Sequence, residues 1–153
     1  MKKLSAIVTL LLIVAAPMEA RAFWNTGLAS VTNNYSKSVR VVDQEDRNSD
    51  LGVINVGRPF ISKLTIPWCD STAELQSKAL NFMETGPLKI LFYLCQNYQD
   101  NMVYFVPGNG ALWDPNDPVT KVDWASRVRC APAPASYIDV IIGSNGLPTC
   151  TPK

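Results

Sequence analysis

Residues 88–107 read LKILFYLCQNYQDNMVYFVP, and this stretch constrains the fold more than any other part of the chain. In an extended conformation, successive side chains point to opposite faces of a strand. One face would carry Leu88, Ile90, Phe92 and Leu94, and the other face Leu91, Tyr93 and Cys95. A strand that is apolar on both faces is typical of the middle of a sheet that is covered on both sides. A polar segment at 96–101 and a second apolar run at 102–106 then predict a hairpin.

Segments in which apolar and polar residues alternate predict further strands at 38–43, 51–56, 60–66 and 137–142. Residues 71–83 fit two patterns, because Ser71 and Glu74 form a capping box for a helix while 78–83 alternates as a strand does. We expect one helical turn at 71–76 and then a strand. The sequence therefore predicts an all-β fold: an antiparallel β-sandwich of about seven or eight short strands with at most one short helical turn.

The first 22 residues have the pattern of a bacterial signal peptide. Lys2 and Lys3 precede an apolar run at 4–16, and Ala20-Arg21-Ala22 has the small-x-small pattern of a cleavage site. The alternative is a membrane anchor, but the run is much shorter than the roughly 20 residues that span a bilayer. We therefore expect export, to the periplasm or the medium, and a mature chain that begins at Phe23. Removing 22 of 153 residues leaves 131, the size of a single domain at 23–153.

All four cysteines lie outside this leading segment, at positions 69, 95, 130 and 150. An even number of cysteines in an exported chain predicts disulfides. Zinc fits poorly, because the chain has no histidine and no C-x-x-C pattern. Three connectivities are possible for four cysteines. We favour Cys69–Cys95 with Cys130–Cys150, because these pairs close the shortest loops.

Charge and motifs argue against several classes of function. Without residues 1–22 the chain keeps 11 of its 14 basic and 12 of its 13 acidic residues, and none forms a like-charge run. This balance disfavours nucleic acid as a partner through charge alone. The absence of histidine removes the usual general base, and no G-x-S-x-G motif or P-loop is present. A small hydrolase that uses two of Asp114, Asp117 and Asp123 remains the enzymatic alternative, and we lean against it.

Residues 46–50, DRNSD, offer a weak calcium motif through Asp46, Asn48 and Asp50. Alternating oxygen side chains of this kind can converge on Ca²⁺. Leu51 and Gly57 stand where the helix–loop–helix pattern needs a glycine and a glutamate. A solvated turn that keeps a hairpin soluble is the interpretation we favour, and no other cofactor is expected.

Residues 107–119, PGNGALWDPNDPV, form the segment we expect to bind a partner. A long loop in a compact domain is usually functional or disordered, and this composition predicts little regular structure. Trp113, Asp114 and Asp117 in the segment, with Trp124 shortly after it, place indoles beside carboxylates. Such groups suit a protein or a glycan. The alternative is that both tryptophans plug one end of the core.

The leading hypothesis is an exported, disulfide-linked β-sandwich that binds a protein or glycan through its loops. A lipid-binding or pore-forming sandwich would be favoured if Trp24, Tyr35, Tyr98 and Trp113 shared one exposed rim. No resemblance to a known family is specific enough to add to these hypotheses.

Overall fold

The computed structural model describes residues 25–46, 49–114, 122–131 and 136–153. These residues form ten strands, one α-helix and one 3₁₀ turn. The strands are β1 (Gly27–Asn33), β2 (Val39–Asp43), β3 (Ser49–Ile54), β4 (Pro59–Thr65), β5 (Leu80–Glu84), β6 (Ile90–Gln96), β7 (Val103–Pro107), β8 (Val128–Ala131), β9 (Tyr137–Ile142) and β10 (Pro148–Pro152). The helix α1 is Thr72–Lys78, and the 3₁₀ turn η1 is Trp124–Ser126.

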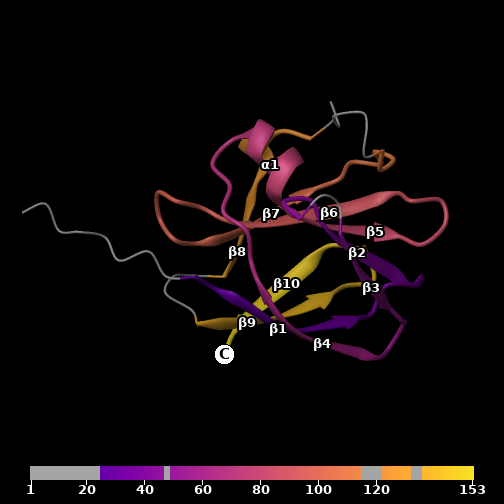
Figure 1. Cartoon of the computed structure of the whole chain (residues 1–153). Helices are drawn as coiled ribbons and strands as arrows, with labels where there is room; N and C mark the ends of the chain where they lie inside the picture. The colour runs from indigo at the N-terminus through magenta and orange to yellow at the C-terminus, as the bar shows by residue number, and fades with distance from the viewer. Residues whose placement is uncertain (1–24, 47–48, 115–121, 132–135) are drawn as a thin grey trace, which may run out of the picture.

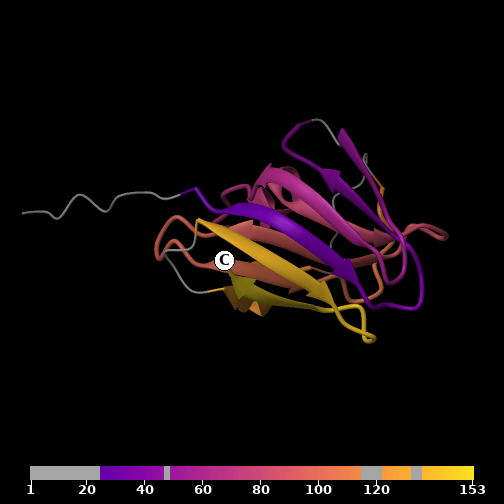
Figure 2. The ribbon, with the colours of Figure 1, turned by 90° about the horizontal axis from the view of Figure 1, so that it is seen from below.

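The strands make two sheets that lie face to face, and α1 covers the outer side of the larger one (Figure 1; Figure 2, from the side of the smaller sheet). The smaller sheet has the order β10-β9-β1-β4, and the larger has the order β3-β2-β5-β6-β7-β8. Neighbouring strands are antiparallel except β1 and β9, which are parallel. The predicted all-β sandwich with one short helix is confirmed.

The core between the sheets is mainly apolar. Phe92 on β6 stacks on Phe82 of β5 with 4.5 Å between ring centroids, and its edge meets Phe105 of β7 at 6.2 Å. From the opposite sheet, β1 and β9 contribute Leu28, Val31, Ile138, Val140 and Ile142. Side chains of both sheets therefore share one dry layer, the arrangement that stabilises a sandwich.

The expected central strand is confirmed. Every residue of β6 is buried, and the strand lies between β5 and β7. One detail is wrong: Leu91 shares the sandwich core with Phe92, and Ile90 points to the outer face. The register with β5 shifts between Phe82 and Met83, which indicates a bulge in β6. A bulge adds one residue and reverses the alternation beyond it.

The strand count is higher than the seven or eight expected, and β10 is one of the strands that no pattern predicted. Residues 148–152 read PTCTP, which contains two prolines and little apolar alternation. β10 lies at an edge of its sheet and pairs with β9 alone, a position where proline is tolerated. Pairing with β9, rather than its own sequence pattern, gives this segment its extended form.

Helix α1 begins with the predicted cap. Ser71 Oγ accepts a hydrogen bond from the Glu74 backbone N–H at 3.2 Å, which satisfies one of the free donors of the first turn. The helix extends to Lys78, two residues beyond the expected turn, and β5 follows directly. Leu75 is its buried residue and anchors the helix on the sheet.

The segment 107–113 is more regular than its composition indicated. Asn109 and Gly110 have φ of +52° and +77°, and the Ala111 N–H donates to Gly108 O at 3.0 Å, which makes a tight type I′ turn. The chain then pairs again with the start of β6, through a bridge between Leu112 and Lys89. A side chain at Gly108 would meet Ile90 O at 2.2 Å, so this close approach requires glycine.

Both expected disulfides form. Cys69–Cys95 joins the segment before α1 to β6, and both residues are fully buried. Cys130–Cys150 joins β8 to β10 and so links edge strands of the two sheets. Such bridges suit an oxidising environment, as export predicts. Residues 1–22, with their predicted signal peptide, and Phe23 lie outside the described part. Across the described ranges, no helix is long and apolar enough to span a membrane.

Candidate functional site

The two predicted tryptophans lie on the same layer of the molecule. Trp113 and Trp124 are both half-buried and pack against the outer-face cluster. We use this name for the buried residues Cys69, Leu75, Ala79, Ile90, Tyr93, Cys95, Val106, Ala111 and Val122 on the α1 side of the larger sheet. Asp114 is exposed, and Asp117 lies outside the described residues. Each indole is thus partly core and partly surface, between the two alternatives that the sequence left open.

Trp113 is held by the backbone that continues the β6–β7 pairing. Its N–H donates to Leu88 O at 2.8 Å, and its neighbour Leu112 is exposed. The indole therefore packs against the outer-face cluster from a fixed main-chain position.

Trp124 begins the short turn η1, which hydrogen bonds fix to α1. Asp123 caps the turn by accepting from the Ala125 N–H at 3.1 Å. Thr72 Oγ donates to Asp123 Oδ1 at 3.1 Å and accepts from the Trp124 N–H at 3.0 Å. Asp123, considered above as a catalytic carboxylate, has this structural role.

Beside Trp124, two arginines and a tyrosine complete a surface that we call the arginine patch: Tyr104, Trp124, Arg127 and Arg129. The Arg127 guanidinium lies 5.0 Å from the Trp124 ring centroid and 5.3 Å from that of Tyr104. The two rings meet edge to face at 5.8 Å. Arg127 Nη1 also donates to the Trp124 carbonyl at 3.3 Å. A guanidinium on two aromatic faces is held in place before any partner arrives.

The two arginines of the arginine patch form no ion pair with the described carboxylates around them. Arg127 and Arg129 are exposed, and neither has a carboxylate within ion-pair distance among the described residues. Burial and a hydrogen bond to Asp100 raise the pKa of Tyr104, and the two arginines lower it by a smaller amount. The phenol therefore stays neutral, and Asp100 is used by Tyr104.

The weak calcium motif is only partly described. Asp46 is exposed, and Asn48 lies outside the described residues. The Asp50 carboxylate accepts from the Gly52 N–H at 3.0 Å and lies 3.6 Å from Arg40 Nε. In the described ranges, no group of three or more acidic or cysteine side chains is arranged to hold a metal. Asp50 thus serves the β2–β3 hairpin, which supports the interpretation of this segment as a solvated turn.

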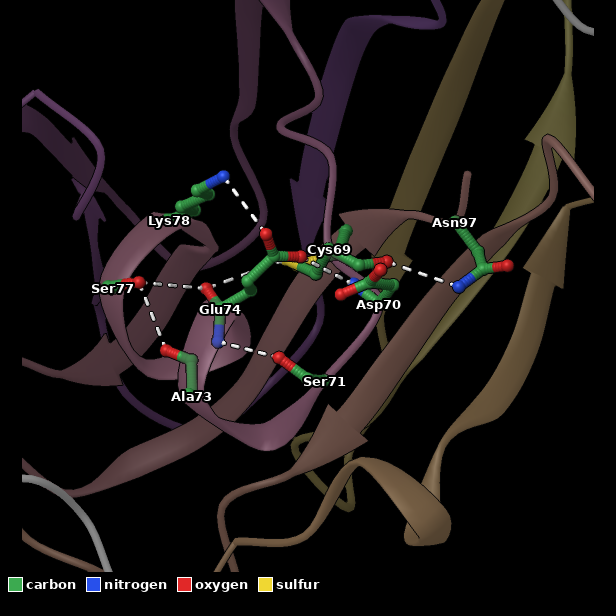
Figure 3. Close-up of polar contacts among 9 residues, drawn as sticks. Cys69, Asp70, Ser71, Ala73, Glu74, Ser77, Lys78 and Asn97 are labelled. Atoms are coloured by element: carbon green, nitrogen blue, oxygen red, sulfur yellow. Dashed lines mark hydrogen bonds and ion pairs between the residues drawn. A yellow bond between two sulfur atoms is a disulfide. The ribbon is translucent and has the colours of Figure 1, made fainter. Parts of the chain in front are cut away.

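Asp70 and Glu74 are in contact in the structure, and neither is among the three aspartates considered above for a hydrolase. Glu74 accepts from the Asp70 N–H at 3.0 Å and from Lys78 Nζ at 3.1 Å, at the start of α1 (Figure 3). Contact between the two acids raises the pKa of Asp70 and lowers that of Glu74. Because these contacts complete the helix cap, they are explained by the stability of α1.

The described aromatics do not share one rim. Tyr98 follows β6 and stacks on Trp68 with 4.9 Å between centroids. Tyr35 lies near the opposite end of β6, where it lines a cleft with Leu91. Trp24 is outside the described residues. Tyr35 and Tyr98 therefore do not share one exposed rim, which is the arrangement that would have favoured a lipid-binding or pore-forming sandwich.

The sequence identified Trp124 but missed its three partners in the arginine patch. Tyr104 falls in the apolar run at 102–106, which predicts only the second strand of the hairpin. A weak signal was present, since Arg127 and Arg129 are separated by one residue and so share a face of an extended chain.

Searches of protein-family models, curated proteins and solved structures found no match to this chain.

Proposed function

We propose that this protein is an exported interaction module that binds an acidic protein partner through the arginine patch. One observation carries the proposal: the Arg127 guanidinium is held against both Tyr104 and Trp124 while its charge has no carboxylate partner in the described part of the chain. Tryptophan, tyrosine and arginine are the residues most enriched at the energetic centres of protein interfaces.

A protein partner fits these contacts better than a neutral glycan. Sugars bind aromatic residues by stacking on ring faces, and Arg127 already occupies a face of both rings. The groups left to a partner are guanidinium N–H donors, which pair well with carboxylates in a fork geometry. Pre-ordering of Arg127 by the rings reduces the entropy that a partner must pay on binding.

Site-specific crosslinking in cells that export the full chain would test the proposal. A photoreactive amino acid at Ser126, between Trp124 and Arg127, should capture a protein with an acidic surface. The same residue at Thr151, exposed on edge strand β10, should not. Absence of a Ser126-specific product, or one that lacks an acidic surface, would contradict the proposal.

A pair of arginine variants tests the role of charge. Arg129→Gln should lower capture at Ser126 at least fivefold, because the partner loses a charged hydrogen bond worth more than about 1 kcal/mol. Arg58→Gln removes an exposed arginine from the β3–β4 turn and serves as the matched control. Equal capture by the two variants would rule out the arginine patch as the contact.

A further inference from the structure

A second surface lies at the opposite end of β6 and β7. It is a cleft of about 240 Å³ between the β1–β2 turn, the β5–β6 loop, the type I′ turn after β7 and the β9–β10 turn. We call it the end cleft. It is lined by Tyr35, Lys89, Ile90, Leu91, Pro107, Asn109, Gly110, Asn145, Gly146 and Leu147. The segment 107–119, which the sequence marked for binding, contributes the type I′ turn to its wall.

Two side-chain acceptors at or near the end cleft are already occupied. Glu84, with its side chain 3% exposed, accepts from the Tyr35 hydroxyl at 2.5 Å and from Lys37 Nζ at 2.7 Å. Asn145 Oδ1 accepts from the Leu147 N–H at 3.0 Å.

Donor groups of the end cleft are not occupied in the same way. Lys89 is exposed, and its ammonium has no ion pair within 4 Å in the described ranges. No described acceptor takes the Asn109 or Gly110 backbone N–H, and the Nδ2 of Asn145 is equally without a described acceptor. Lys37 neutralises Glu84, so Lys89 leaves the cleft with a net positive charge. An unpaired cation beside unoccupied N–H donors favours an anion.

Part of the lining is apolar, and the cleft is small. Leu91, Pro107 and Leu147 supply hydrocarbon surface, and the volume is below the 300–1,000 Å³ typical of sites for drug-sized ligands. One branched apolar group with a carboxylate, about the size of a single amino-acid residue, matches both properties.

We propose that the end cleft binds a carboxylate attached to a short branched apolar group. Lys89 supplies the charge, the type I′ turn and Asn145 supply N–H donors, and Leu91 and Leu147 cover the apolar part. Such a group has two chemical sources: a free organic acid or the C-terminal residue of a peptide. This binding is independent of the arginine patch, because it uses none of the same residues.

Amide-detected NMR titration of the full chain with three probes tests the proposal: 4-methylpentanoate, acetyl-Gly-Gly-Leu with a free carboxylate, and the same peptide as its carboxamide. At least one carboxylate probe should shift the amides of Asn109, Gly110 and Leu147, and the carboxamide should bind at least fivefold more weakly. Tighter binding of the peptide acid assigns the site to peptide C-termini, and equal or tighter binding of 4-methylpentanoate assigns it to free acids.

Lys89→Gln should lower the affinity for the carboxylate probe at least fivefold. The variant should still fold, because Lys89 is exposed. Arg58→Gln, a cation lost outside the cleft, should leave affinity unchanged. The proposal is overturned if neither carboxylate shifts these amides at 20 mM, on the order of the weakest useful affinity for a ligand of this size. It also fails if the carboxamide binds as well as the acid, or if Lys89→Gln has no effect.

Discussion

The two faces of the larger sheet are buried by different means. On the inner face, the smaller sheet covers apolar residues such as Phe82 and Phe92 with a regular layer of side chains. On the outer face, α1, η1 and the segment around Trp113 cover a cluster that includes a disulfide and the phenol of Tyr93. Regular strands can bury a face completely, whereas short irregular segments leave side chains half-covered.

This difference explains why the arginine patch lies on the outer side. Trp124 is half-buried because it belongs to η1, a turn of only three residues that leaves one side of the indole open. Tyr104 lies at the rim of the same face, beside edge strand β8. On the inner face Phe82 and Phe92 are fully buried, and the half-buried aromatics Tyr35 and Phe60 pack against the core. The residues of the proposed arginine patch therefore lie where the cover of the outer face is incomplete.

Removal of the disulfides should have the largest effect on the free energy of unfolding, and the size of the loss should differ between the two disulfides. Replacing Cys69 and Cys95 with alanine should lower the free energy of unfolding by up to about 5 kcal/mol, and replacing Cys130 and Cys150 by about 2–3 kcal/mol. The loops are similar, at 26 and 20 residues, but the first pair is also fully buried in the outer-face cluster. Urea denaturation would measure both losses. Equal losses would show that cross-linking alone, and not burial of Cys69 and Cys95, determines the stability that each disulfide contributes.

Truncation of one aromatic on each face should give the next largest effect. Phe92→Ala removes a fully buried ring and should lower the free energy of unfolding by about 3–5 kcal/mol. Trp113→Ala removes a half-buried indole, and about 2 kcal/mol is expected from the smaller area that it buries. Thermal and urea unfolding would check both values. A larger loss for Trp113 would show that the outer face is the principal core.

Asn81 should reveal a polar defect of the outer face. Its side chain is fully buried on β5, and neither amide atom has a hydrogen-bond partner in the described structure. Asn81→Leu, close in volume, should therefore raise the free energy of unfolding by about 1 kcal/mol. Asn81→Ala, which leaves a cavity, is the comparison variant. If Asn81→Leu destabilised the protein as much as Asn81→Ala, the Asn81 amide would have a stabilising partner that the described structure does not contain.

The smallest effect concerns pH and the end of the sandwich near Tyr35. Burial raises the pKa of Glu84, but hydrogen bonds from Lys37 and Tyr35 outweigh it and hold the pKa below the ordinary 4.5. Stability from a lowered carboxyl pKa is present above the unfolded value and is lost as the pH falls through the folded value. The free energy of unfolding of Glu84→Gln should thus approach that of the wild-type chain as the pH falls below 4.5.

Urea unfolding at pH 7, 5, 4 and 3 would measure this convergence. Asp46→Asn, at an exposed carboxylate, should show a much smaller change over the same range. A difference between Glu84→Gln and the wild-type chain that stayed constant with pH would show that the network contributes little to folding.

Local sequence determined much of this protein. Alternation in 39–43 and 137–142 was sufficient for β2 and β9, and the all-apolar run around Phe92 fixed a central strand with cover on both faces. Ser71 and Glu74 specified the start of α1, and loop lengths favoured the disulfide pairing that forms. Each of these properties depends on neighbours in the chain, so a pattern of a few residues contains it.

Tertiary structure decided the rest. The bulge that turns Ile90 outward depends on register with β5, and the extended form of 148–152 depends on pairing with β9. In both cases the partner is the preceding strand, but the register between two strands is not contained in the pattern of either one alone. The arginine patch likewise needs β7 and η1 to meet, which brings Tyr104 to Trp124 and Arg127. Side chains far apart along the chain make a site only after the sheets fix the distances between them.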